Sequence, residues 1–226
     1  MDVSLEGLQT TSEGHPKIID CFDFTGIGDV DTSIVKEMDS KSVLIGLSGR
    51  KLKIPSKWKN PSGKWHLGLK SLYKPSTSDY TSEKLSEIDC IVWFNGEKWC
   101  ACIETFGNLK NAKILTNFRD SHEFGILCLN KMELAYCVTL HNEGNLLEIF
   151  TPYKDHGSIV AQIAAAHFPG KPERNGLAPG AQIIYMNTTH TEKGNYEINY
   201  NAFKKAILKC AEMKVDIINY SCTYIG

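Results

Sequence analysis

Residues 155–166 of the chain read Asp-His-Gly-Ser-Ile-Val-Ala-Gln-Ile-Ala-Ala-Ala. Val160, Ile163 and Ala164 recur at helical spacing, and apolar or small residues fill the other side as well. A helix that is apolar nearly all round is typically a buried one. The pattern therefore predicts a buried helix with His156 in its first turn, where rigid structure holds an imidazole that faces a cleft as a general base. The alternative is a histidine that only caps or packs at the start of a helix.

Two further blocks follow this stretch. Residues 175–185 read Asn-Gly-Leu-Ala-Pro-Gly-Ala-Gln-Ile-Ile-Tyr, and residues 215–221 read Val-Asp-Ile-Ile-Asn-Tyr-Ser. In this order, the three blocks resemble those of the subtilisin-like serine peptidases. The resemblance implies that His156 is the catalytic histidine, that the second block turns into a strand, and that the third is a strand beside the substrate groove. Two positions depart from the family motif: Ser158 stands where threonine is usual, and Ile159 where a second histidine is usual.

Other blocks resemble one subfamily, tripeptidyl-peptidase II, which generic subtilisins do not match. They extend from about residue 8 to residue 222 and include residues 8–11, 16–20, 26–30, 46–50, 53–55, 60–64, 144–147, 167–169 and 173–176. The resemblance implies a cytosolic serine exopeptidase that acts on peptide substrates, releases tripeptides from free N-termini and assembles into homo-oligomers.

The bulk composition excludes several partners. With 25 basic and 26 acidic residues, the chain has no long-range field that would attract nucleic acid or an anionic membrane. No apolar run approaches the roughly 20 residues of a membrane span. The first residues lack the basic start and apolar core of a secretory signal. We therefore expect a cytoplasmic protein that binds neither nucleic acid nor membrane.

The cysteines and glycines do not indicate a cofactor. None of the eight cysteines is part of a Cys-x-x-Cys pair, and several lie in apolar runs, which is typical of reduced, partly buried thiols in the cytosol. A zinc site built on Cys100 and Cys102 is the alternative, on the weak evidence of two cysteines one residue apart. Glycines 26, 28 and 46 do not form a Gly-x-Gly-x-x-Gly array. We expect no metal, nucleotide or organic cofactor.

Three aspartates compete for a catalytic role. Asp23 begins Asp-Phe-Thr-Gly after an expected strand over residues 17–24, similar to the family's Asp-Ser/Thr-Gly. In tripeptidyl-peptidase II, however, the motif Asp-Thr-Gly-Val-Asp-Pro precedes the segment that residues 8–11 match. Asp2 then falls on its second aspartate, and the catalytic aspartate falls before residue 1. We expect Asp23 to be a structural carboxylate, and Asp155 to point away from His156, because neighbours at a helix start usually diverge.

The resemblance and the residue pattern together predict an α/β fold: a partial subtilisin-like parallel sheet with helices, carrying a mostly β insertion. Residues 1–29 would start the subtilisin-like domain, residues 30–150 would form the insertion, and residues 151–226 would form an incomplete α/β core. Within the core, residues 181–187 and 215–219 are expected strands joined by a polar connection at 195–201 and a helix at 203–213, a βαβ unit.

The insertion shows hairpin signals. Residues 88–104 alternate about Asn95-Gly96, a dipeptide typical of the type I′ turn, and residues 133–151 form a second pair of runs about residues 142–145. Residues 42–45 are a further strand candidate, and residues 74–87 an expected mobile loop. The four tryptophans of this region are expected in a separate β core, with a peptide-docking surface as the alternative: Trp58, Trp65, Trp93 and Trp99.

The catalytic set is incomplete. A subtilisin-like peptidase needs an aspartate, a histidine and a serine in that order, and His156 alone matches; no Gly-Thr-Ser-Met-Ala-type block occurs. Ser221, Cys222 and Thr223 occupy the family's substrate-binding stretch, with Thr223 where glycine is usual. We predict a fragment of a tripeptidyl-peptidase II-like serine peptidase that is inactive as the isolated chain. The alternative is a non-catalytic relative that binds peptides or a family enzyme.

Overall fold

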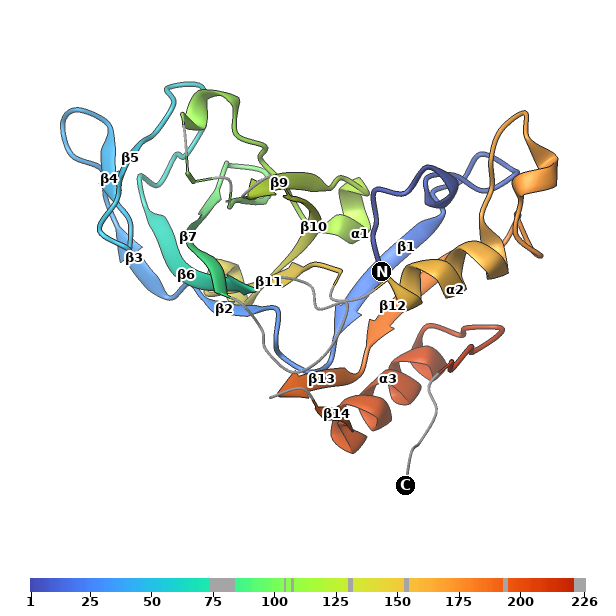
Figure 1. Ribbon diagram of the computed structural model, residues 1–226. Helices are drawn as coiled ribbons and strands as arrows, with labels where there is room; N and C mark the ends of the chain where they lie inside the picture. The colour runs from blue at the N-terminus through green and yellow to red at the C-terminus, as the bar shows by residue number, and fades with distance from the viewer. Residues whose placement is uncertain are drawn as a thin grey trace.

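The computed structural model describes residues 1–73, 84–103, 105–106, 108–129, 132–152, 155–192 and 195–221. Figure 1 shows a β-rich body beside a smaller part that holds helices α2 (His156–Ala165) and α3 (Tyr200–Glu212), with the start of the chain next to α2. The mixture of helices and sheets confirms the predicted α/β class. The division at residues 29 and 150 stays a prediction.

A parallel pair of strands supports the α/β part. β1 (Ile18–Asp23) pairs with β12 (Ile183–Asn187), so the strands predicted over residues 17–24 and 181–187 are confirmed. Helix α3 confirms the helix predicted over residues 203–213. Its start is fixed by Asn199, whose side chain accepts a hydrogen bond from the Ala202 amide at 3.0 Å. Its buried side rests on β12, where Cys210 Sγ lies 3.4 Å from Met186 Sδ.

Two predictions about the end of the chain are wrong. Residues 195–201, expected as a polar connection, contain strand β14 (Asn195–Ile198), which pairs with β13 (Thr189–Glu192). Residues 215–219 form no strand, although they are described, and Ile217 is 84% exposed. An extended segment needs a neighbour for its backbone groups, and no described strand pairs with this one. The predicted βαβ unit therefore lacks its last strand here.

The β-rich body contains two four-stranded sheets and a small hairpin. The first sheet has the order β2 (Asp29–Asp31), β11 (Leu146–Phe150), β10 (Met132–His141), β9 (Gly125–Leu129). The second has the order β3 (Ile34–Lys36), β6 (Trp65–Tyr73), β7 (Lys84–Phe94), β8 (Trp99–Cys102). The hairpin pairs β4 (Val43–Ile45) with β5 (Lys51–Lys53), and short helical turns complete the chain: η1 (Glu6–Leu8), η2 (Leu109–Asn111), α1 (Phe118–Ser121), η3 (Asn142–Gly144) and η4 (Pro172–Arg174).

Strand β7 separates two hydrophobic cores. Because successive side chains of a strand point to opposite faces, Ile88 and Cys90 enter a core shared with the first sheet, whereas Ile91 and Trp93 enter a second core. In this second core, the ring of Trp93 stacks on Trp58 at 4.7 Å and lies 5.3 Å from Trp65. Trp99 packs elsewhere, against His66 at 5.3 Å. The expected β core built on tryptophans is thus present, with three of the four in one cluster.

The hairpins are confirmed, but one turn and one loop differ from expectation. Phe94 pairs with Trp99, so the turn spans residues 95–98, and the Asn95 side chain accepts from the amides of Glu97 and Lys98 at 2.9 Å. This Asx turn replaces the predicted type I′ turn, because a side chain supplies the hydrogen bonds. Of the expected loop at 74–87, residues 74–83 lie outside the described residues, and β7 already begins at Lys84, where β6 supplies a partner.

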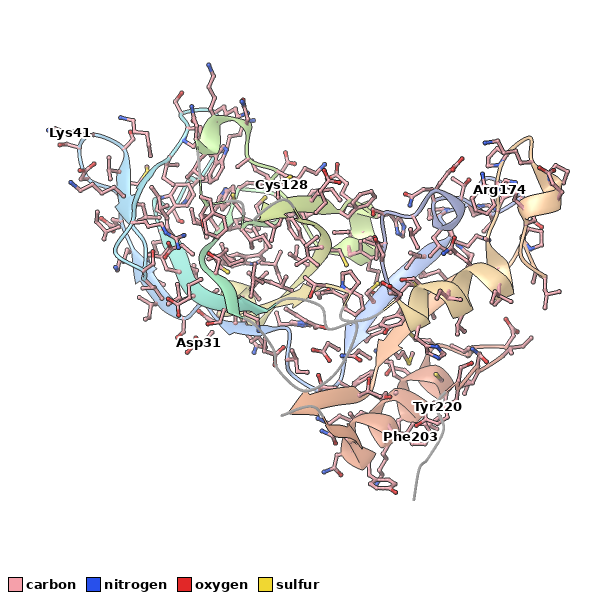
Figure 2. All side chains as sticks on the ribbon, viewed as in Figure 1. Asp31, Lys41, Cys128, Arg174, Phe203 and Tyr220 are labelled. Carbon is pink, nitrogen blue, oxygen red and sulfur yellow. The ribbon has the colours of Figure 1, made fainter. Side chains whose placement is uncertain are left out.

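None of the seven described cysteines forms a disulfide; Cys222 lies outside the described residues. Six are buried, and Cys128 is exposed on β9 (Figure 2). Burial raises the pKa of Cys100 to about 11, so this thiol is protonated at neutral pH. In the described ranges, no three His, Cys, Asp or Glu side chains come together as metal ligands, Cys100 and Cys102 included. No helix in the described part of the chain has the length and apolar character needed to cross a membrane.

Candidate active-site histidine

His156 is the first residue of α2, as predicted, and it is exposed. The Asp155 carbonyl accepts the hydrogen bond from the Ile159 amide at 2.9 Å that starts the helix, while the Asp155 side chain makes no capping bond. His156 Nε2 lies 2.9 Å from the carbonyl oxygen of Ser221. A carbonyl oxygen can only accept, so Nε2 is the protonated nitrogen in this arrangement. The imidazole is therefore held on rigid structure with its ring at the surface.

Helix α2 is not the buried helix that its sequence predicts. One side packs on the chain, with Ser158, Ala161 and Ala165 buried, but Ile159 is 51% and Ile163 is 62% exposed. The exposure of the second side of α2 has a physical reason. Burial of the second side needs another layer of structure, and no described segment covers it.

The start of the chain lies at the first turn of α2. The Asp2 amide donates to Ser158 Oγ at 2.8 Å, so Ser158 keeps the hydroxyl of the family's threonine and uses it to hold residue 2. The Asp2 carboxylate accepts from the amide and the hydroxyl of Ser4, at 2.8 and 2.6 Å, rather than from His156. Asp2, from the segment that resembles the aspartate motif, and His156, from the histidine block, are therefore brought to the same end of α2, although the Asp2 carboxylate bonds Ser4 and does not orient the imidazole.

Asp23 has a structural role at the end of β1. Its Oδ1 accepts from the Thr25 amide at 3.0 Å, from Thr25 Oγ1 and from Asn187 Nδ2 at 3.0 Å, and its Oδ2 accepts from the Gly28 amide at 2.8 Å. These four hydrogen bonds fix the turn after β1 and the neighbouring strand β12. The carboxylate is fully occupied, which supports the interpretation that Asp23 is no catalytic surrogate.

The segment predicted to bind substrate is only partly described. Ser221 reaches His156 through its backbone, while its hydroxyl lies 3.0 Å from Asn219 Nδ2; Cys222 and Thr223 lie outside the described residues. Phe203 and Tyr220 hold this segment to α3, with ring centroids 4.9 Å apart (Figure 2). The contact of Ser221 with His156 could not be found from the sequence, because a main-chain carbonyl carries no residue signature.

Sequence reasoning also missed a charged junction between the α/β part and the first sheet. Glu148 on β11 is buried; its Oε1 accepts from the Asp23 amide at 2.7 Å, and its Oε2 from His141 Nε2 at 3.0 Å. The hydrogen bond to Glu148 raises the pKa of His141, against the opposing effect of burial, with Asp29 and Asp20 adding smaller attractions. Burial raises the pKa of Asp29, and the Glu148 charge adds to that shift. The single signal in the sequence is that His141 and Glu148 lie on either side of the turn of the second hairpin.

This pair makes stability depend on pH. A raised pKa in the folded state means that the stabilisation is fully present below about pH 6.5, the unfolded value, and is lost as pH rises through the folded value. As the pH rises from 5.5 to 8.5, we expect the free energy of unfolding of the wild-type chain to fall relative to that of His141→Gln. Because the His141 side chain is 41% exposed, the effect should be about 0.5 kcal/mol. Urea unfolding of both proteins at pH 5.5 and 8.5 measures it. A difference between the two proteins that is independent of pH would contradict the assignment.

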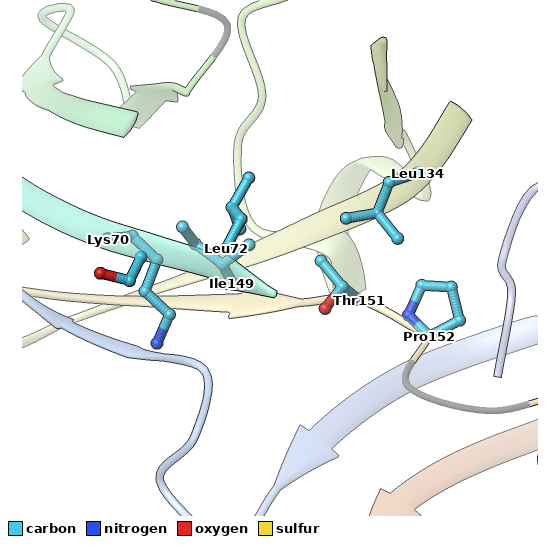
Figure 3. A pocket seen from close by; sticks show the side chains of 7 residues that line it. Lys70, Leu72, Leu134, Ile149, Thr151 and Pro152 are labelled. Atoms are coloured by element: carbon cyan, nitrogen blue, oxygen red, sulfur yellow. The ribbon is translucent and has the colours of Figure 1, made fainter. Parts of the chain in front are cut away.

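Two cavities lie in the β-rich body. One has a volume of about 20 Å³ and is lined by Lys70, Ser71, Leu72, Leu134, Ile149, Thr151 and Pro152 (Figure 3). That volume suits about one water molecule. The other is an open hollow of about 250 Å³ beside β9, lined by Phe106, Asn108, Asn111, Ala112, Ile126, Leu127 and Cys128. Neither is lined by His156, which is exposed.

Comparison with known proteins agrees with the motif order. The model of the subtilase family matches residues 132–224, which include His156. Tripeptidyl-peptidase 2 of Caenorhabditis elegans is 35% identical over 286 residues, covering 98% of this chain and 21% of the relative. The Oryza sativa subsp. japonica protein of the same name is 31% identical, with the same two coverages. The worm alignment is longer than this chain of 226 residues, so the relative carries additional residues within the matched region.

A solved structure shows the same fold. The crystal structure of tripeptidyl peptidase 2 superposes with a TM-score of 0.70 at 19% identity, over 94% of this chain and 21% of that chain. This chain thus spans about a fifth of the length of its relatives, and it matches their N-terminal portion. The order of the motifs, the matched family model and the shared fold agree. The chain is therefore similar to the subtilase family over residues 132–224, and over nearly its whole length it is similar to the N-terminal portion of the tripeptidyl-peptidase 2 relatives.

Proposed function

We propose that this chain supplies the histidine-bearing part of a serine peptidase site that releases tripeptides from the N-termini of oligopeptides. His156 would take the proton of a serine hydroxyl as general base and return it to the leaving amine. One observation carries the proposal: in a chain 35% identical to a tripeptidyl-peptidase 2, the motif histidine lies exposed on the first turn of α2. By the same resemblance, the complete protein would be a cytoplasmic homo-oligomer without a cofactor.

The tautomer of His156 supports the proposal that the isolated chain is inactive. A general base needs its lone pair on Nε2, and in the triad an aspartate achieves this by accepting the Nδ1 proton. Here the Ser221 carbonyl accepts from Nε2, which places the proton on the nitrogen that should be bare. The Asp2 and Asp23 carboxylates are bonded elsewhere. Among the described residues no carboxylate accepts a hydrogen bond from Nδ1 of His156, and the sequence holds no serine block of the family type, so the histidine lacks both partners here.

The isolated 226-residue chain is therefore expected to release no fluorophore from an Ala-Ala-Phe amide. Intact enzymes that lose one triad member keep about 10³–10⁴-fold catalysis over water from the oxyanion hole and binding. The resemblance implies that the family's oxyanion asparagine follows the region that this chain matches, so we expect a rate equal to that of buffer. The measurement compares wild type with His156→Ala. Turnover in wild type that disappears in the variant would contradict the proposal of inactivity.

The positive test is a chimaera in which residues 1–226 replace the matched segment of the worm relative. The flanking worm segments then supply the aspartate and the serine. We expect release of tripeptides from an oligopeptide with a free N-terminus and none from its N-acetylated form, followed by mass spectrometry. A folded, inactive chimaera that still binds oligopeptides would favour a non-catalytic peptide-binding relative instead.

A further inference from the structure

The surface around the hairpin of β4 and β5 is basic, although the whole chain is almost neutral. From residue 41 to residue 64 the sequence contains no Asp or Glu. Lys53 Nζ donates to the Lys41 carbonyl at 2.8 Å, which brings these two residues together, and Figure 2 shows Lys41 at the margin of the β-rich body. The exposed lysines of this segment form no ion pair with a described residue: Lys41, Lys51, Lys53, Lys57, Lys59 and Lys64. The net charge of −1 therefore conceals a local excess of positive charge.

The outer edge of β5 carries backbone groups without a partner strand. The Gly46 amide donates to the Arg50 carbonyl at 2.9 Å, so residues 46 and 50 form a hydrogen-bonded pair of the hairpin. Hydrogen-bonded and non-hydrogen-bonded pairs alternate in an antiparallel ladder, so the amide and carbonyl groups of Lys51 and Lys53 point away from β4. No described strand pairs with this edge. β5 therefore offers the donors and acceptors of two residues to a further strand.

The outer edge of β4, by contrast, is already occupied. The Val43 carbonyl accepts from the Asp39 amide at 3.0 Å, and the Val43 amide donates to Asp39 Oδ1 at 2.8 Å. The Ile45 carbonyl accepts from Lys36 Nζ at 3.1 Å. These contacts agree with the alternation along the hairpin, because residues 43 and 45 pair with residues 53 and 51. In the described part of the chain, β5 is thus the open edge of this hairpin.

The side chains of β5 determine which kind of strand can pair there. Lys51 and Lys53 are exposed, and Leu52 between them is buried in the second core. Residues directly opposite each other in an antiparallel pair have side chains on the same face, so the residues facing the two lysines would be two positions apart. Carboxylates at these positions would be attracted, whereas the lysines of a second copy would be repelled. The residue between them would lie beside Leu52, where an apolar side chain fits.

We propose that the outer edge of β5 binds an extended acidic polypeptide segment as an added strand, with carboxylates facing Lys51 and Lys53 and apolar residues between them. A polypeptide suits this edge better than a nucleic acid, because phosphate oxygens can accept from the amides of β5 but cannot donate to its carbonyls. The remaining exposed lysines of residues 41–64 add a longer-range attraction for the acidic segment. Binding at this edge does not involve His156, so it is independent of peptidase activity.

The test uses the 226-residue chain and a fluorescein-labelled peptide whose central sequence is Glu-Val-Glu-Val-Glu. Fluorescence anisotropy gives the dissociation constant at low and high salt, and we expect saturable binding that salt weakens. The double variant Lys51→Glu/Lys53→Glu should raise the dissociation constant at least about tenfold, because attractive pairs become repulsive. The control Lys204→Glu/Lys205→Glu makes the same change of net charge at exposed lysines of α3 and should bind as wild type does. Equal thermal midpoints of the two variants show that both are folded.

Two further peptides separate strand addition from simple charge attraction. One has the same composition in the order Glu-Glu-Glu-Val-Val, and the other is N-methylated at its glutamates. Each should bind at least about fivefold more weakly, because the first loses the alternation and the second loses the backbone donors. Absence of binding, equal binding of the three peptides, or equal loss in the two double variants overturns the proposal. So does tighter binding of an oligonucleotide of equal charge, which would assign the surface to nucleic acid. A wild-type dimer in light scattering that the peptide dissociates would assign the edge to a second copy and overturn it as well.

Discussion

In the chimaera with the worm relative, His156→Ala is expected to lower kcat for tripeptide release by about 10⁴–10⁶-fold. The imidazole acts on the serine hydroxyl in the transition state, and without it the nucleophile stays protonated. KM should change little, because His156 contributes one exposed ring to ground-state contacts. Initial rates over a range of oligopeptide concentrations give both constants.

A matched substitution at a second exposed histidine keeps this result specific. His15 lies in the turn before β1, with its side chain 66% exposed and 4.0 Å from Glu13. His15→Ala is expected to leave kcat within about twofold of the parent chimaera. Equal losses in the two variants would show damage to the fold rather than loss of a base. Retention of activity in His156→Ala would remove His156 from the catalytic role.

Trp93→Ala is expected to lower the free energy of unfolding of the 226-residue chain by about 3–5 kcal/mol. Trp93 is 1% exposed at the centre of the second core. Its removal leaves a cavity between Trp58 and Trp65, ends both ring contacts and breaks the hydrogen bond from Nε1 to the Lys59 carbonyl at 3.0 Å. Urea unfolding followed by far-UV circular dichroism measures the loss.

The neighbouring residue on β7 supplies the control. Phe94 points to the other face of the strand and is partly exposed, so Phe94→Ala is expected to cost about 1 kcal/mol or less. The two substitutions remove aromatic rings from adjacent positions of one strand and differ in burial. Similar losses for both would contradict the placement of Trp93 in a closed core.

Much of the local structure could be predicted from the sequence. The start of α2 at His156, helix α3, strand β12 and both hairpins follow from short-range patterns: apolar spacing, capping residues and turn residues. The family was also readable from three motif blocks in order. These features depend on residues a few positions apart, so a linear reading contains the information that determines them.

Tertiary structure alone decided which of these elements are covered and what their polar groups contact. The sequence of α2 predicts burial and that of residues 215–219 predicts a strand, yet Ile163 and Ile217 are exposed because no described segment lies over the one or pairs with the other. The contacts of His156 with Ser221 and of His141 with Glu148 join residues through the fold. The residue composition of a helix or strand indicates that it would be stable when buried or paired. Whether it is buried or paired depends on where the other elements lie.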